Sequence, residues 1–312
     1  MLQKPIFGGI SFFVIFVLIM IFSVIYHDSI STFYDSYLCL LIIGIVAFSM
    51  GLADDLFQSS PYFKFLIQIL CAIVFISCGI VFVVSPISWI NYVITIIWVV
   101  GIMNSINMLD NMDGITCLVS FSIFSFSFFY ELCFSTSLAN FELALLLALS
   151  VALLVFLFYN SHPSKFYMGD NGSQFIGVML AYFGIKIFGN FTEIADNDFA
   201  INSVQFIVLI LAFIIPISDT TTVTINRLIK GVSPFNGDKN HTTHYLFYLG
   251  IPIRFIGLIM FFLNLGGVAL AFYLIHNFDK FEYNKIYIFL IYPIIVFGFL
   301  YANTKISKEK EF

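Results

Sequence analysis

Long apolar runs separated by short polar segments fill the whole chain. A helix needs about 20 residues to cross the ~30 Å hydrocarbon core of a bilayer, and ten of the runs reach or approach that length. We expect membrane helices over residues 7–26, 36–53, 61–84, 87–106, 115–134, 141–159, 171–189, 203–225, 252–275 and 285–304. The pattern predicts an all-α polytopic membrane protein with about ten transmembrane helices.

Composition supports this class of protein. Apolar residues make up 61% of the chain and charged residues 10%, with a mean hydropathy of +1.02, whereas soluble domains are about 25% charged. No segment is left for a folded soluble domain, so residues 1–312 are expected to form a single integral-membrane domain. The net charge of −5 gives no reason to expect a nucleic-acid partner. Five scattered cysteines without a CxxC pair indicate packing residues rather than disulfides or a zinc site.

The basic residues predict the orientation, because cytoplasmic loops carry an excess of Lys and Arg. The first run is too long for a signal sequence and is read as a retained span. With a cytoplasmic N-terminus, three basic residues fall toward the outside: Lys186, Lys280 and Lys285. The other ten fall on or near the cytoplasmic side: Lys4, Lys64, Lys165, Arg227, Lys230, Lys239, Arg254, Lys305, Lys308 and Lys310. Ten spans then leave both termini in the cytoplasm, as in a multi-pass protein of the bacterial inner membrane.

Acidic residues gather on the same predicted side. Asp110 and Asp113 follow an apolar run directly, and their spacing of three places them on one face of a helical turn. A single segment of this kind could be an ordinary polar loop, but similar segments recur along the chain. The carboxylates placed at this face are Asp54, Asp55, Asp110, Asp113, Asp170, Asp219 and Asp238. Amides and histidines accompany them at Asn104, Asn107, Asn160, His162, His241 and His244.

Clustered carboxylates repel one another unless cations compensate them. Oxygen ligands without thiols suit Mg²⁺, with Mn²⁺ as the alternative. The neighbouring basic and histidine side chains suit phosphate oxygens. A metal and phosphates at a membrane face point to phosphoryl transfer onto or from a lipid.

Each part of this candidate site also has a simpler explanation. Asp54 and Asp55 could cap a turn, and Lys64 could be an interfacial lysine that reaches toward water. Asp219 could bond the hydroxyl groups of the following threonine run. His241 and His244 could ligate a metal, although partners at zinc spacing are missing and phosphate contact is preferred. An intramembrane aspartyl protease or an ion-coupled transporter are the alternative functions.

Five stretches together resemble the polyprenyl-phosphate N-acetylhexosamine-1-phosphate transferases, a family that includes the phospho-MurNAc-pentapeptide translocase. They are PIFGGIS (5–11), GLADDL (51–56), NMLDNMDG (107–114), YNSHPSKFYMGDNGS (159–173) and the segment 215–244 that ends in NHTTH. The resemblance implies a Mg²⁺-dependent, often dimeric membrane enzyme. It would join a UDP-activated amino sugar phosphate to undecaprenyl phosphate, release UMP and start a cell-envelope polysaccharide such as lipopolysaccharide or O-antigen.

The resemblance also implies roles for individual residues. The catalytic positions it suggests are Asp54, Asp55, Asp110 and Asp113, and the metal ligand is Asp170. Substrate contacts are expected from Lys64, Asn107, Asn160, Arg227, Lys239, His241 and His244. The form of the histidine segment is closer to the GlcNAc branch than to the MurNAc-pentapeptide branch.

Two departures from the family pattern stand out. Relatives usually carry a further helix ahead of the GGI segment, and a third histidine where Thr243 stands here. The implied reaction is attack of a lipid phosphate oxygen on the sugar-proximal phosphorus. Asp54 or Asp55 would either deprotonate the lipid phosphate or hold the metal, and a covalent aspartyl-phosphate route stays open.

Overall fold

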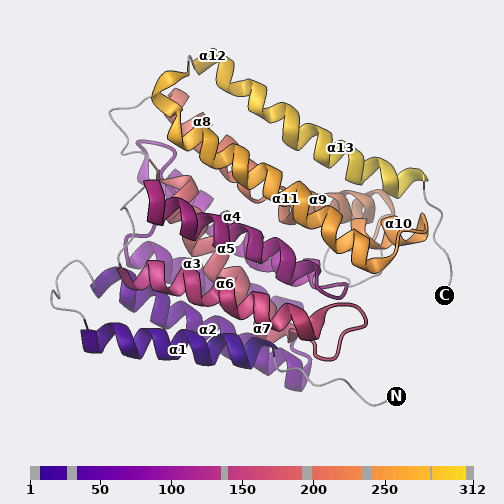
Figure 1. Ribbon diagram of the computed structural model, residues 1–312. Coiled ribbons are helices and arrows are strands. Elements are labelled where there is room, and N and C mark those ends of the chain that lie inside the picture. Colours follow the sequence, from indigo (N-terminus) through magenta and orange to yellow (C-terminus); the bar gives the residue numbers. More distant parts are fainter. Residues whose placement is uncertain are drawn as a thin grey trace.

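The protein is a bundle of helices, seen here in a computed structural model that describes residues 8–26, 34–134, 140–191, 199–233, 241–281 and 283–306. No strand occurs within these ranges (Figure 1). The first seven helices are α1 (Gly8–Tyr26), α2 (Tyr34–Phe57), α3 (Pro61–Ser77), α4 (Ser88–Leu109), α5 (Ile115–Phe134), α6 (Asn140–Asn160) and α7 (Gly169–Phe183). A π-helical turn, η1 (Gly184–Gly189), continues α7.

The second part of the bundle contains shorter and broken elements. They are α8 (Phe199–Ala212), α9 (Ile214–Ile229), α10 (Thr242–Tyr248), α11 (Ile253–His276), η2 (Phe278–Lys280), α12 (Tyr283–Ile286), η3 (Tyr287–Leu290) and α13 (Ile291–Ile306). The first turn of α1 and the last turn of α13 lie at the same end of the bundle (Figure 1).

Helix α7 occupies the centre of the bundle. Every residue from 171 to 185 is buried, whereas α1 exposes large apolar side chains such as Leu18 and Ile25 along its length. Helices α1, α2 and α4 pack against α7. The residues at the start of α7 are therefore surrounded by neighbouring helices at one end of the bundle.

The all-α membrane class predicted from the apolar runs is confirmed. Among the described residues, eight helices are long and apolar enough to cross a membrane, or nine if α8 and α9 count as one broken span. The expected span 61–84 is shorter, because α3 ends at Ser77 and Gly79 adopts a φ of +74°. Each of the ten predicted runs contains helix within the described residues, but this run and 203–225 do not form single full-length spans.

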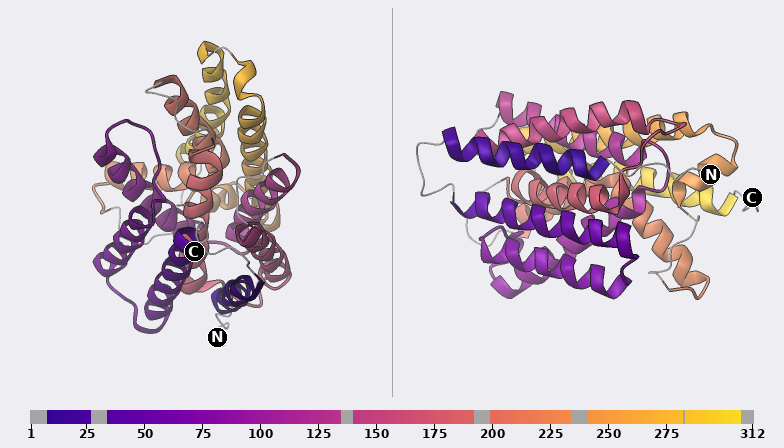
Figure 2. Two further views of the ribbon diagram at one scale, coloured as in Figure 1. Left: turned by 90° about the vertical axis from the view of Figure 1, so that its left-hand side faces the viewer. Right: turned by 90° about the horizontal axis from the view of Figure 1, so that it is seen from below.

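The expected span 203–225 is not one straight helix. Helices α8 and α9 meet at an angle of 86°, and α9 leaves the direction of the other helices in the right-hand view of Figure 2. Pro216 explains the position of the break. A proline ring clashes with the carbonyl four residues earlier and removes a helical hydrogen bond, and α8 ends at that residue, Ala212.

Candidate active site

A close crossing of two helices brings the acidic pair of α2 to the start of α7. A Cβ atom added at Gly51 would lie 2.3 Å from the carbonyl oxygen of Asp170, so only glycine permits this approach. Asp54 and Asp55 follow Gly51 by about one helical turn. The crossing therefore positions both carboxylates beside Asp170, more than a hundred residues further along the chain.

Asp170 itself is oriented by the turn that begins α7. Gly169 has a φ of +79°, a conformation that glycine adopts readily and other residues rarely do. Asp170 then falls in the first turn of α7, where the helix dipole favours a negative charge. Its side chain keeps 33% exposure, so it lies at the boundary between the bundle and solvent.

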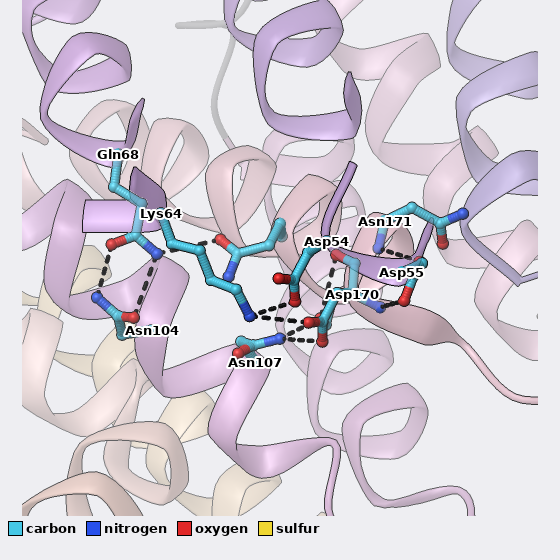
Figure 3. A network of polar contacts seen from close by, with 10 residues as sticks. Asp54, Asp55, Lys64, Gln68, Asn104, Asn107, Asp170 and Asn171 are labelled. Carbon is cyan, nitrogen blue, oxygen red and sulfur yellow. Dashed lines mark hydrogen bonds and ion pairs between the residues drawn. The ribbon is translucent and has the colours of Figure 1, made fainter. Parts of the chain in front are cut away.

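Lys64 joins two of the acids (Figure 3). Its ammonium group forms an ion pair with Asp54 and lies 3.0 Å from Oδ2 of Asp170. Asp54 is buried, and burying a charge is costly unless an opposite charge accompanies it. A turn of three residues between α2 and α3 keeps Lys64 close to Asp54. Lys64 is therefore a member of the acidic group, whether or not it also lies at the membrane interface.

Asn107 completes the surroundings of Asp170. Its Nδ2 donates to Oδ1 of Asp170 over 2.8 Å and to Oγ of Ser173 over 2.9 Å. Two oxygens of one carboxylate thus receive a cation from α3 and an amide donor from α4. This arrangement keeps Asp170 ionised and fixed in direction.

Asp55 has a different environment from Asp54. Its two oxygens accept the backbone N–H groups of Asp170 (2.9 Å) and Asn171 (3.0 Å). These are N–H groups of the first turn of α7, which have no partner within the helix itself. Asp55 therefore holds the start of α7 in place, and Asp54 is the acid of the pair that faces Lys64.

A layer of amides lies one turn deeper in the same three helices. Gln68 Nε2 donates to Oδ1 of Asn104 and to Oε1 of Gln174, each over 3.2 Å, and Asn104 returns a bond of 2.8 Å to Gln68. Gln68 and Gln174 are buried. The layer links α3, α4 and α7, and its members Gln68 and Asn104 lie to one side of Lys64, Asn107 and Asp170 (Figure 3). Gln174 was not among the residues expected to matter, although a glutamine within an apolar run is a signal that the sequence itself contains.

The segment after α4 is held by the loop that precedes α7. Oδ2 of Asp113 lies 2.8 Å from Nδ1 of His162 and accepts the backbone N–H of Ser164 over 3.1 Å. Asn160 accepts the N–H of Gly114 over 2.9 Å and donates to the carbonyl of Phe166 over 3.0 Å. These contacts brace two loops. A direct role of Asp113 in catalysis, or of Asn160 in substrate contact, stays a prediction.

Asp110 lies between this braced loop and the Asp170 group. Burial raises the pKa of its carboxyl to about 7, and the negative charges of Asp170 and Asp55 act in the same direction. Asp110 is therefore a group whose charge changes near neutral pH.

The histidine segment is anchored by a buried acid of α9. Asp219 contacts Nδ1 of His241 over 2.9 Å and the backbone N–H and hydroxyl of Thr242 over 2.9 and 2.6 Å. The expectation that Asp219 bonds only the threonine run that follows it is wrong. Thr243 is also fully buried, and its hydroxyl donates to Oδ1 of Asn111 over 2.7 Å.

The remaining expected residues belong to α9, α10 and the segment between them. His244 is partly exposed, and its ring centroid lies 5.9 Å from that of His241. Arg227 is buried at the end of α9, with 4% exposure. Lys239 and Asp238 lie outside the described residues.

The carboxylate ligands at Asp170 fit a magnesium ion that is held partly by the protein and partly by the substrate. Within the described ranges no cluster of three or more His, Cys, Asp or Glu side chains could enclose a metal. Mg²⁺, however, is commonly held by one or two carboxylates together with substrate phosphates and water. Asp54 and Asp170 supply such a pair, and the ammonium group they share shows that the pair accepts a cation.

Known proteins resemble this chain across most of its length. Residues 37–188, which include the Asp170 group, match the family described as glycosyl transferase family 4. A probable undecaprenyl-phosphate N-acetylglucosaminyl 1-phosphate transferase of Bacillus subtilis is 29% identical over 269 residues, which cover 83% of this chain and 70% of that protein.

Two further relatives have related names. The undecaprenyl-phosphate alpha-N-acetylglucosaminyl 1-phosphate transferase of Salmonella typhi is 25% identical over 80% of this chain and 67% of its own length. The decaprenyl-phosphate N-acetylglucosaminephosphotransferase of Mycobacterium tuberculosis is 35% identical over 124 residues, which are 39% of this chain and 30% of that protein.

Proposed function

Because the chain belongs to glycosyl transferase family 4, we propose that it transfers N-acetylglucosamine 1-phosphate from UDP-GlcNAc to undecaprenyl phosphate and releases UMP. The names of its relatives support this donor and acceptor. The observation that carries the proposal is the group of Asp54, Lys64, Asn107 and Asp170 from four helices at one end of a membrane bundle. Such an end gives a lipid phosphate access from the bilayer and a nucleotide access from water.

The chemistry is an exchange at one phosphorus atom. An oxygen of the lipid phosphate forms a bond to the sugar-proximal phosphorus of UDP-GlcNAc. The bond from that phosphorus to the oxygen that bridges the two phosphates breaks, and UMP leaves with the electron pair. Lipid phosphate has a second pKa near 6, so at neutral pH it needs little help from a base.

The residues of the site then act mainly by binding and orientation. Lys64 provides a cation for the phosphate oxygens, and Asn107 holds the direction of the Asp170 carboxylate. Asp54 and Asp170 would hold Mg²⁺, which supplies positive charge against the negative charge that develops on the leaving UMP. Asp55 keeps the start of α7 fixed, and His241 and His244 are proposed to donate to the diphosphate.

The setting we propose is the cytoplasmic face of a bacterial inner membrane, at the start of a cell-envelope polysaccharide. The basic residues support this side. A transporter would place its acids near the middle of the bilayer, whereas these acids lie at helix ends. An aspartyl protease would have no use for the lysine that contacts both carboxylates or for the adjacent histidine segment.

The direct test is release of UMP by the purified protein in detergent. We expect release to require UDP-GlcNAc, undecaprenyl phosphate and Mg²⁺ together, to stop with EDTA and to return with Mg²⁺ or Mn²⁺. A panel of other UDP-amino sugars identifies the preferred donor. Absence of release with every donor of the panel would contradict the proposal.

A further inference from the structure

A fully buried carboxylate of α9 has no part in the reaction described above. Asp219 is 0% exposed, and a buried charge is retained at a cost unless partners compensate it. Its two oxygens divide their contacts. Oδ2 meets the ring of His241, and Oδ1 receives the N–H and the hydroxyl of Thr242 at the start of α10.

The contact with His241 determines which ring nitrogen carries a proton. A carboxylate accepts hydrogen bonds, so Nδ1 of His241 must be the donor. No hydrogen bond to Nε2 is seen within the described part of the chain. Nε2 is therefore the edge of the ring that a ligand can use.

The opposite side of α10 is tied to the polar segment after α4. The hydroxyl of Thr243 donates to Asn111, the neighbour of Asp110. The contacts with Asp219 and the bond to Asn111 hold α10 between α9 and the segment that contains Asp110 and Asp113. The ring of His241 is thus fixed in position, with the proton of Nδ1 held by Asp219, before any substrate arrives.

We propose that Asp219 is a positioning residue for the transfer reaction. It fixes the direction of the His241 ring, and its carboxylate balances the positive charge that the ring carries while Nε2–H donates to a phosphate oxygen of the nucleotide sugar. This inference rests on the proposed function, but it concerns a residue that does not itself contact the substrate.

A control substitution is possible because the two carboxylate oxygens of Asp219 have different partners. Thr242→Val removes only the hydroxyl bond to Oδ1 and leaves the His241 contact intact. If Asp219 served only to begin α10, Thr242→Val and Asp219→Asn would affect the protein in the same way. If Asp219 acts through the ring, the two substitutions differ in kinetics.

The experiment is a double-substitution cycle on UMP release, with UDP-GlcNAc varied. We expect Asp219→Asn and His241→Gln each to lower kcat/KM by about 10-fold or more, the loss of one charge-assisted hydrogen bond. The double variant should be no worse than His241→Gln alone. Thr242→Val should lower the melting temperature and leave the KM for UDP-GlcNAc unchanged. Losses that multiply in the double variant, or an unchanged KM and kcat in Asp219→Asn, would overturn the proposal.

A measurement on the unsubstituted protein covers the case in which Asp219→Asn does not fold. Nitrogen-15 NMR of labelled histidine, with His241→Gln used for assignment, should show that Nδ1 of His241 carries a proton. An Nδ1 without a proton would overturn the proposal. Failure of the wild-type protein to release UMP would instead contradict the proposed function, whatever the state of His241.

Discussion

Single residues of the acidic pair have separable tasks, because adjacent positions on α2 face different partners. Asp54 contacts a lysine side chain, and Asp55 contacts two backbone N–H groups of another helix. Neutral substitutions at the two positions should therefore give different phenotypes, although the sequence presents them as a pair.

Asp55→Asn should destabilise the protein more than Asp54→Asn does. An asparagine has one acceptor oxygen, so one N–H at the start of α7 loses its partner, at a cost of about 1–3 kcal/mol. Asp54→Asn should reduce UMP release with a smaller change in the melting temperature, because Lys64 keeps Asp170 as a partner. Thermal unfolding and kinetics of both variants check this, and equal melting temperatures would contradict it.

Asp170→Asn should lower turnover by orders of magnitude and leave a folded protein. The substitution removes the charge that Lys64 contacts and the proposed ligand of Mg²⁺. The matched variant is Asp113→Asn. The partners of Asp113 are a histidine and a backbone N–H in the loop that precedes α7. Near-normal turnover of Asp170→Asn at low Mg²⁺ would show that the ligand is another residue.

Asp110 predicts a pH dependence of stability in the metal-free protein. Its folded pKa of about 7 exceeds the ordinary value of 3.8, so the folded state binds the proton more tightly than the unfolded chain. The cost of ionisation is fully present above pH 7 and is relieved as the pH falls toward 4. At about 1.4 kcal/mol per pKa unit, Asp110→Asn should be more stable than the wild-type protein at pH 8. When the pH is lowered from 8 to 5.5, the variant should gain less stability than the wild type. An equal change in melting temperature between pH 8 and pH 5.5 for the two proteins would contradict this.

At the scale of helices, the contact between α2 and α7 places the site. Gly51→Ala should force the two helices apart, because the added carbon would lie 2.3 Å from the backbone of Asp170. We expect loss of both UMP release and thermal stability. Gly101→Ala on α4 is the control, since nothing lies within 4 Å of its added carbon and alanine favours a helix by about 0.5–1 kcal/mol. Comparable losses in both variants would contradict the role given to the crossing.

The helices themselves were predictable from the sequence, because an apolar run of about 20 residues has few other stable forms in a bilayer. The break between α8 and α9 was not predicted, although Pro216 marked its position. Which acid meets which partner was also beyond prediction. The contacts of Asp55 with α7 and of Asp219 with His241 join residues 115 and 22 positions apart, and only the packing of helices brings them together.

The histidine segment shows the same limit. The family resemblance implies a further histidine, and with it a phosphate contact, at the position of Thr243. The hydroxyl instead bonds Asn111 and the residue is fully buried. A histidine at this position would need space that the structure does not offer.

For the molecule as a whole, the basic residues predict that the acidic end faces the cytoplasm. Lys230 directly follows the last residue of α9, and Lys280 lies just after the end of α11. In a variant with Cys133 replaced by serine, Lys230→Cys should react with an impermeant thiol reagent only after the cells are permeabilised. Lys280→Cys should react in intact cells. The reverse pattern would contradict the orientation and the proposed cytoplasmic site.

The central position of α7 has a consequence for how the chain enters the membrane. Asp170, Asn171, Ser173 and Gln174 make its first turns polar, and their partners lie on α2, α3 and α4. A helix with such a start partitions poorly into lipid by itself. During synthesis those three helices emerge from the ribosome first, so the polar partners of α7 are already in the membrane when α7 arrives. The order of segments along the chain is thus also an order of assembly, in which the reaction centre forms only after its surroundings have been inserted.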